Sequence, residues 1–167
     1  MFTQLSAVIF KNAPVVLKPL LSIVPFVVQK KALEHTLSQL FAEALIDGDF
    51  EFLTDRWLRI SVTDLNLDWM VSFDGEKLLI EPQGHPVKPF DVSFSASGDD
   101  LLLIAARKED PDSLFFQRRL IIEGDTELGL EVKNLIDSVE LDGLPTFVNS
   151  AVNFSAEQIE LNNAVNG

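Results

Sequence analysis

Two runs of alternating residues constrain the fold of this 167-residue chain more than any other feature. In the runs 57–63 and 67–74, every second residue is apolar. This period of two places successive side chains on opposite faces of a β-strand, so each run predicts a strand with one buried face. Asp74-Gly75 is a hairpin turn signal that leads into a third strand at 77–81. The chain therefore builds an antiparallel sheet whose apolar face needs a cover.

Helical periodicity on both sides of these runs supplies that cover. Ser97 and Asp100 form a capping box before an apolar run, and Asp110-Pro111 opens a further helix. The proline-rich segment 82–89 predicts a loop. Helices are expected at 31–45, 101–106, 111–116, 126–141 and 144–152, and strands at 90–96 and 119–123. This order predicts an α+β domain in which helices cover one face of a mainly antiparallel sheet.

Composition excludes several classes of protein. The length fits one domain, and the net charge of −13 has the wrong sign for binding phosphate backbones, so no nucleic-acid partner is expected. No cysteine is present, which excludes disulfides, thiolate catalysis and zinc fingers. Thirteen Phe and no Tyr fit either an interior rich in large apolar groups that need no buried polar partner, or a lineage bias in composition.

The apolar segment 13–28 is the most unusual part of the chain. Three prolines and Lys18 interrupt it, and it is shorter than the roughly 20 residues that a membrane-spanning helix needs. It also lacks the features of a signal peptide. Residues 1–46 carry four Lys and Arg against two Asp and Glu, whereas the remainder carries nine against 24. Two interpretations remain: a lid packed on the core, or a segment in the membrane interface.

Catalytic motifs are not found in the sequence. His35 and His85 are the only histidines, and their surroundings predict solvated side chains rather than a base or a metal ligand. Glu123, Asp125 and Glu127 cluster at a strand-to-helix turn, where a carboxylate-dependent hydrolase would need them. The same cluster is typical of a helix N-terminus, with Asp125 as the cap. We favour capping and expect neither a metal site nor a cofactor.

The segment 105–141 carries a family resemblance. Its two parts read AARKEDPDSLFFQRRL and IIEGDTELGLEVKNLIDSVEL, and they closely resemble ubiquinone-biosynthesis accessory factors that have a sterol-carrier-protein-type lipid-binding domain. FEFLTDRWLRISVTDLNLDW and FDVSFSASGDDLLLIAARK extend the similarity more weakly, over residues 30–145 in all. Some of these factors end in a long coiled coil. The short chain after Leu141 favours the type without one.

The resemblance implies a five-stranded sheet covered by helices that enclose an apolar tunnel, without catalytic residues. It divides the chain into an apolar, basic N-terminal lid or membrane-contact segment (1–29), the lipid-binding domain (30–145), and a C-terminal helix with a frayed tail (146–167). The expected lipid-binding residues are Trp69, Phe73, Phe94, Leu101, Ile104, Phe115, Phe116, Leu128, Val132 and Leu135. A filled core and a lipid-binding tunnel require the same residue types, so the sequence alone does not distinguish them.

The resemblance also implies a cellular role. The family serves the oxygen-independent branch of ubiquinone synthesis in Gram-negative bacteria, so the expected ligand is a lipid or a prenylated quinone precursor, and the expected partners are ubiquinone-biosynthesis enzymes. A cytoplasmic protein is expected, with transient contact to the inner membrane through residues 1–31. Two alternatives stay open: a lipid-modifying enzyme that uses Glu123, Asp125 or Glu127, and a packed scaffold that docks partners through its acidic surface.

Overall fold

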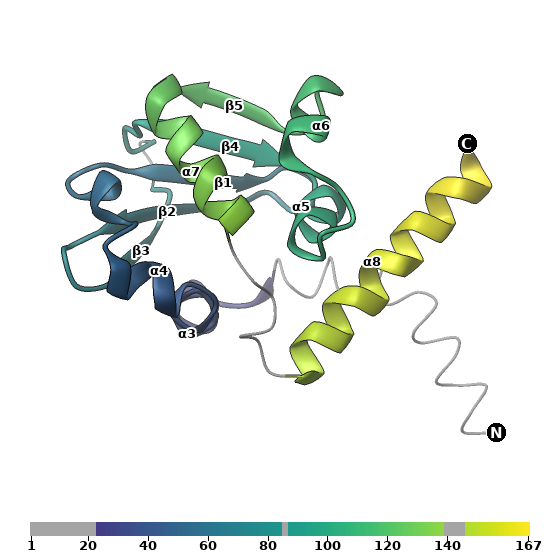
Figure 1. Ribbon diagram of the computed structural model, residues 1–167, viewed down its shortest axis with the longest axis horizontal. Coiled ribbons are helices and arrows are strands. Elements are labelled where there is room, and N and C mark those ends of the chain that lie inside the picture. Colours follow the sequence, from purple (N-terminus) through teal and green to yellow (C-terminus); the bar gives the residue numbers. More distant parts are fainter. Residues whose placement is uncertain (1–22, 85–86, 139–145) are drawn as a thin grey trace.

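Helices surround a central sheet in the computed structural model, which describes residues 23–84, 87–138 and 146–167 (Figure 1). In chain order, the elements are α3 (Phe26–Leu40), α4 (Ala42–Asp47), a 3-10 turn (Glu51–Leu53), β1 (Leu58–Val62), β2 (Leu67–Phe73), β3 (Leu78–Pro82), β4 (Val92–Ala96), α5 (Gly98–Ala105), α6 (Pro111–Phe116), β5 (Ile121–Gly124), α7 (Thr126–Ser138) and α8 (Thr146–Asn166).

The five strands form one sheet in the order β3-β2-β1-β4-β5. The pairs β1–β2, β2–β3 and β4–β5 are antiparallel, and only the central pair β1–β4 is parallel. The prediction of a mainly antiparallel α+β fold is confirmed. Pro82, which cannot donate a ladder hydrogen bond, ends the edge strand β3, where proline is tolerated.

The two faces of the sheet differ in polarity. One face presents Leu58, Val71 and Phe94, which belong to the main hydrophobic core. The opposite face presents Arg59, which pairs with Asp68 at 2.8 Å and lies 5.6 Å from the ring centroid of Phe90. Figure 1 shows α7 lying across the apolar face while α3 and α4 run along its lower side. The alternating runs therefore bury the face that their periodicity predicts.

Side chains begin the helices where the sequence predicts. The Ser97 hydroxyl accepts a hydrogen bond from the Asp100 N–H at 3.1 Å at the start of α5. The Asp110 carboxylate accepts one from the Ser113 N–H, also at 3.1 Å, at the start of α6. Each cap satisfies a backbone donor that the first helical turn would leave without a partner.

Two helices differ from their predicted ranges. The helix expected at 31–45 begins earlier, at Phe26 directly after Pro25, and breaks at Phe41 into α3 and α4. Since α3 starts before residue 30, it crosses the expected boundary of the lipid-binding domain. At the other end, α8 continues to Asn166, so the tail that we expected to fray is helical.

Part of the apolar N-terminal segment and the end of the helix expected at 126–141 lie outside the described residues. Within the described ranges, no helix is long and apolar enough to cross a membrane. The lid and membrane-interface interpretations of segment 13–28 both stay open.

Candidate functional site

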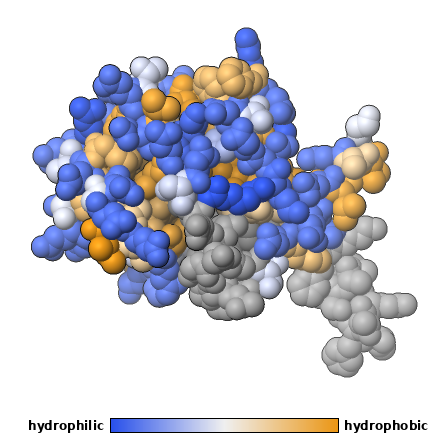
Figure 2. Space-filling view, viewed as in Figure 1, coloured by the Kyte–Doolittle hydropathy of each residue, from blue (hydrophilic) through white to orange (hydrophobic). Residues whose placement is uncertain are grey.

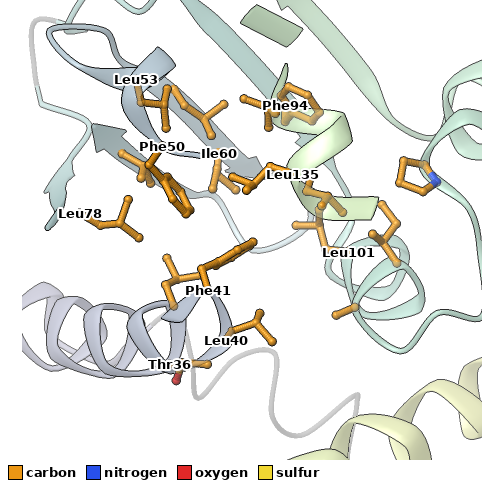
Figure 3. Close-up of a pocket in the computed structure, with 18 of the residues that line it drawn as sticks. Thr36, Leu40, Phe41, Phe50, Leu53, Ile60, Leu78, Phe94, Leu101 and Leu135 are labelled. Atoms are coloured by element: carbon orange, nitrogen blue, oxygen red, sulfur yellow. The ribbon is translucent and has the colours of Figure 1, made fainter. Parts of the chain in front are cut away.

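An apolar cavity of about 340 Å³ lies between the sheet and the helices α3, α5 and α7 (Figure 3). In Figure 3, side chains from all these elements point toward one another across it. The described residues that line it are Thr36, Leu37, Leu40, Phe41, Phe50, Leu53, Leu58, Ile60, Val71, Leu78, Phe94, Leu101, Ile104, Ala105, Arg107, Pro111, Leu120, Val132, Leu135 and Ile136.

Ile60 indicates that the described residues do not fill this space. It lies on β1, the central strand, opposite Trp69 on one side and Phe94 on the other. A residue in the middle of the covered face of a sheet is normally fully buried, because protein interiors are close-packed. Ile60 is nevertheless only partly buried, and it lines the cavity. The helices above it leave a volume that their side chains do not fill.

Aromatic rings build one wall of the cavity. Phe41, at the break between α3 and α4, meets Phe50 edge to face with ring centroids 5.3 Å apart. Phe50 in turn lies 6.1 Å from Phe73, which stands behind it on β2. Edge-to-face pairs are a favoured arrangement of aromatic quadrupoles and hold the rings in place. The break between α3 and α4 therefore changes the direction of the chain and also orients the Phe41 ring toward the cavity.

Polar groups occur only at the rim among the described lining residues. Thr36, Ala105 and Arg107 are the exposed members of the lining, so they mark its mouth between α3 and the end of α5. One guanidinium nitrogen of Arg107, Nη1, donates to the carbonyl oxygen of Asp137 at 3.0 Å and so spans from the end of α5 to the end of α7. The cavity thus combines a hydrocarbon-like interior with one cation at its opening.

Five of the ten predicted lipid-binding residues line the cavity: Phe94, Leu101, Ile104, Val132 and Leu135. Phe73 and Leu128 are buried in the surrounding core but do not reach the space. Trp69 lies beside it, where its indole N–H donates to the Gln29 side-chain oxygen at 3.0 Å beneath α3.

Phe115 and Phe116 were expected to point inward, and the structure contradicts this. Their side chains are 43% and 81% exposed. The helix α6 has only six residues, and its inward positions are taken by Pro111 and Leu114, three residues apart. At 3.6 residues per turn, the two positions after Leu114 turn away from the core. Their aromatic character alone had suggested an interior place.

One group of missed residues comes from the N-terminal helices. Leu37, Leu40 and Phe41 line the cavity. Their helical spacing predicted an apolar face, but nothing in the sequence indicated which part of the domain that face would cover. The amphipathic pattern at 31–45 was the signal that could have found them.

The carboxylate cluster does not belong to the cavity. Glu123, Asp125 and Glu127 are exposed, and none of them lines the space. Asp125 accepts a hydrogen bond from the Leu128 N–H at 3.0 Å, which confirms its predicted capping role. That bond lowers the pKa of Asp125, and the Glu127 N–H and Arg56 lower it further. Such a carboxyl stays ionised and is a poor proton donor near neutral pH.

The histidines and the possible metal ligands among the described residues do not point to a reactive site either. His35 is exposed on α3, as predicted, and His85 lies outside the described residues. In the described ranges, no three His, Asp or Glu side chains are grouped so that they could hold a metal ion. Among the described residues, the apolar cavity is the strongest candidate for a functional site.

Comparison with known proteins assigns the class. The sequence profile of the SCP-2 sterol transfer family matches residues 33–137, which include every described residue that lines the cavity. A solved structure described as "UbiJ-SCP2 Ubiquinone synthesis protein" has a similar fold, with a TM-score of 0.56 and 17% identity over 68% of this chain and 93% of that one. The chain belongs to the SCP-2 sterol transfer family.

Within that family, the chain resembles one type of protein in particular. It is 49% identical over 145 residues to the ubiquinone biosynthesis accessory factor UbiT of Escherichia coli (strain K12). The match covers 87% of this chain and 81% of that relative. UbiT of Escherichia coli O6:H1 matches with the same identity and coverage. The predicted resemblance to sterol-carrier-type accessory factors is confirmed.

Proposed function

We propose that this protein is a non-enzymatic accessory factor of ubiquinone biosynthesis that holds a polyprenylated quinone precursor, or another membrane lipid, by its tail. The apolar cavity is the observation that carries the proposal. Its volume falls within the range of 300–1,000 Å³ that is typical of small-molecule sites. The similarity to UbiT supports a role for this lipid binding in ubiquinone synthesis, and we assign it to the oxygen-independent branch.

The energetics of the cavity support a hydrocarbon ligand. The lining is apolar apart from the exposed rim, so a tail that enters through the mouth exchanges water for hydrocarbon-like contacts. Each CH₂ removed from water contributes about 0.8 kcal/mol, so one five-carbon prenyl unit contributes about 4 kcal/mol.

The polar rim determines how the ligand is oriented. Inside the rim, the described lining side chains offer no hydrogen-bond partner to a quinone ring, and burying the ring oxygens without partners would be costly. Thr36 and Arg107 at the mouth can instead meet the polar end of the ligand. In this arrangement the tail is shielded while the ring stays accessible to the ubiquinone-biosynthesis enzymes that modify it.

The two alternatives have less support. A lipid-modifying enzyme would need its carboxylates beside the bound lipid, but Glu123, Asp125 and Glu127 do not reach the cavity. The cavity among the described residues weighs against a scaffold with a fully packed core. We also propose that the protein is cytoplasmic and that residues 1–31 touch the inner membrane transiently, with their lysines near anionic headgroups.

The decisive experiment measures lipid in the native protein. Organic extraction of the purified chain followed by mass spectrometry is expected to release a prenylated or acylated lipid. Substituting Ile60→Trp places an indole in the cavity and is expected to lower binding of a prenylated quinone precursor by at least about tenfold, since it displaces roughly two or more CH₂ groups of tail.

A matched control separates occupancy from general damage. Leu130→Trp introduces the same side chain at an exposed position of α7 away from the cavity, so binding should not change. If no lipid is extracted and the wild-type chain binds no precursor, the proposed function is wrong. Deleting residues 1–22, which stops before α3, should weaken salt-sensitive binding to anionic vesicles, and unchanged binding would contradict the membrane role of this segment.

A further inference from the structure

Two adjacent aromatic side chains protrude from the end of α6. Phe115 and Phe116 form an edge-to-face pair with ring centroids 5.8 Å apart, and both are exposed. Figure 2 shows an apolar patch over α6 at the top of the view, bordered by hydrophilic side chains. A single exposed apolar residue is ordinary on a protein surface, but a paired aromatic projection is a typical feature of interaction sites.

The projection is firmly anchored. Leu114 and Leu120 on either side of it are buried in the core. Arg119 forms ion pairs with Asp100 and Glu109, which connect the turn to α5 and to the segment before α6. Arg118 ends the helix with a positive φ of 59°, an uncommon conformation for a residue other than glycine. The fold therefore holds Phe115 and Phe116 outward, since the chain re-enters the core directly after them.

The charges around the projection nearly balance, although the chain as a whole is strongly acidic. Asp112 is paired with Lys133 at 2.6 Å, and Asp110, the cap of α6, keeps its negative charge. Arg118 is exposed and forms no ion pair with any described residue. An unpaired guanidinium beside two aromatic rings matches the chemistry of the bilayer interface, where rings enter the headgroup layer and arginine binds phosphate.

The projection is also close to the cavity. Pro111, the first residue of α6, lines the cavity, and Phe116 is the last of its six residues. A helix of this length spans about 9 Å. An element that enters the headgroup layer at Phe116 therefore brings the cavity wall to within about two helical turns of the lipid.

We propose that the α6 tip, which comprises Phe115, Phe116 and Arg118, is a bilayer-docking element that inserts its rings among the headgroups of an anionic phospholipid membrane. This inference rests on the proposed function, because a carrier of membrane lipids must dock on the bilayer that holds its ligand. It is separate from the membrane contact proposed for residues 1–31.

The test compares single variants of the full chain in a vesicle sedimentation assay. Phe116→Ser is expected to weaken binding at least about fivefold, both to pure phosphatidylcholine vesicles and to equimolar phosphatidylcholine and phosphatidylglycerol. Arg118→Gln should weaken binding about fivefold on the anionic vesicles only. Leu130→Ser removes an equally apolar exposed side chain from α7 and should leave binding unchanged. Because all three side chains are exposed, thermal unfolding should not shift.

A second measurement separates this inference from the proposed function. Binding of a soluble fluorescent fatty acid reports on the cavity and should be the same in Phe116→Ser and wild type. If Phe116→Ser binds vesicles as well as wild type does, α6 is not a docking element. The same conclusion follows if the variant loses binding to a purified partner enzyme while vesicle binding is intact. If wild type takes up no fatty acid but the vesicle results hold, only the proposed function fails.

Discussion

The two ends of α7 pack against the sheet in different ways. At its N-terminal end, Gly129 lies so close to β5 that a Cβ there would be 3.2 Å from the Cγ2 atom of Ile122 and 3.7 Å from that of Val92. At its C-terminal end, Val132, Leu135 and Ile136 line the cavity. The apolar face of α7 thus packs tightly against the sheet over its first turns and lines the cavity over the rest.

This difference teaches how a lipid site can be built without special residues. Leu128, Val132 and Leu135 are all buried and all aliphatic, so residue type does not separate the packed end from the hollow end. The close approach depends on the missing side chain at Gly129, and on the tight turn through Gly124 that delivers the chain from β5 into α7. Farther along the helix, α3 and α5 form the walls instead of filling the space.

The largest expected effect comes from Gly124→Ala at the packed end. Gly124 has a φ of +100°, and a Cβ there would overlap the carbonyl oxygen of Asp91, a backbone atom that cannot move aside. Backbone strain and crowding together should lower the free energy of unfolding by about 3 kcal/mol. Urea denaturation monitored by circular dichroism measures this loss.

Gly75→Ala is the matched control. Gly75 also has a positive φ, of +99°, but a Cβ there would meet no atom within 4 Å. The loss of unfolding free energy in Gly75→Ala should therefore come from backbone strain alone and be smaller than the loss in Gly124→Ala. Equal losses in the two variants would mean that the contact with Asp91 does not matter.

A second prediction concerns larger side chains, introduced at the packed end of α7 and on the cavity side. Gly129→Leu forces a side chain between α7 and β5 and should destabilise the fold by about 1–3 kcal/mol. Ile60→Trp adds more atoms on the cavity side, where there is room, and should change the stability by less than about 1 kcal/mol. Urea denaturation of the two variants, side by side with wild type, gives both values.

Gly129→Ala serves as the control for the packed end. Its single methyl group would lie 3.2 Å from the Cγ2 atom of Ile122, a crowded contact that a shift of a few tenths of an ångström relieves, and the gain in helix propensity of about 1 kcal/mol offsets the cost of that shift. Near-neutral stability is expected. If Ile60→Trp were as damaging as Gly129→Leu, the cavity side would be as tightly packed as the β5 side, and the comparison would fail.

The sequence predicted the local features of the fold well. The alternation at 57–63 and 67–74, the Ser97 cap and the Asp110 cap depend on neighbours within a few residues, so the local pattern contains the necessary information. The β1–β4 pairing joins segments about thirty residues apart, and no local pattern indicates that this pair is parallel. The mainly antiparallel character was nevertheless predicted correctly.

The site was predicted only in part, because it depends on the distance between layers. Phe94 and Val132 line the cavity, whereas Phe73 and Leu128, with similar patterns, pack behind it. Nothing in the spacing of these residues distinguishes the two pairs. The outward turn of Phe115 and Phe116 had a local cause in the short α6, but a six-residue segment contains too few turns for its buried face to be identified.

The smallest expected effect comes from Asp125→Ala, which tests how α7 begins at its packed end. The folded-state pKa of Asp125 is lowered from 3.8, chiefly by the Leu128 N–H, so the ionised cap stabilises the folded chain above about pH 4 and this stabilisation is lost as the pH falls through the lower folded value. Asp125→Ala should therefore lower the melting temperature slightly at pH 7, and the deficit should shrink toward pH 3. Asp125→Asn keeps a capping oxygen without the charge and should show a smaller deficit at pH 7. A deficit that stayed constant with pH would mean that the charge of Asp125 makes no contribution. Precursor binding should be the same in all three proteins, because a loss of binding would connect this carboxylate to the cavity after all.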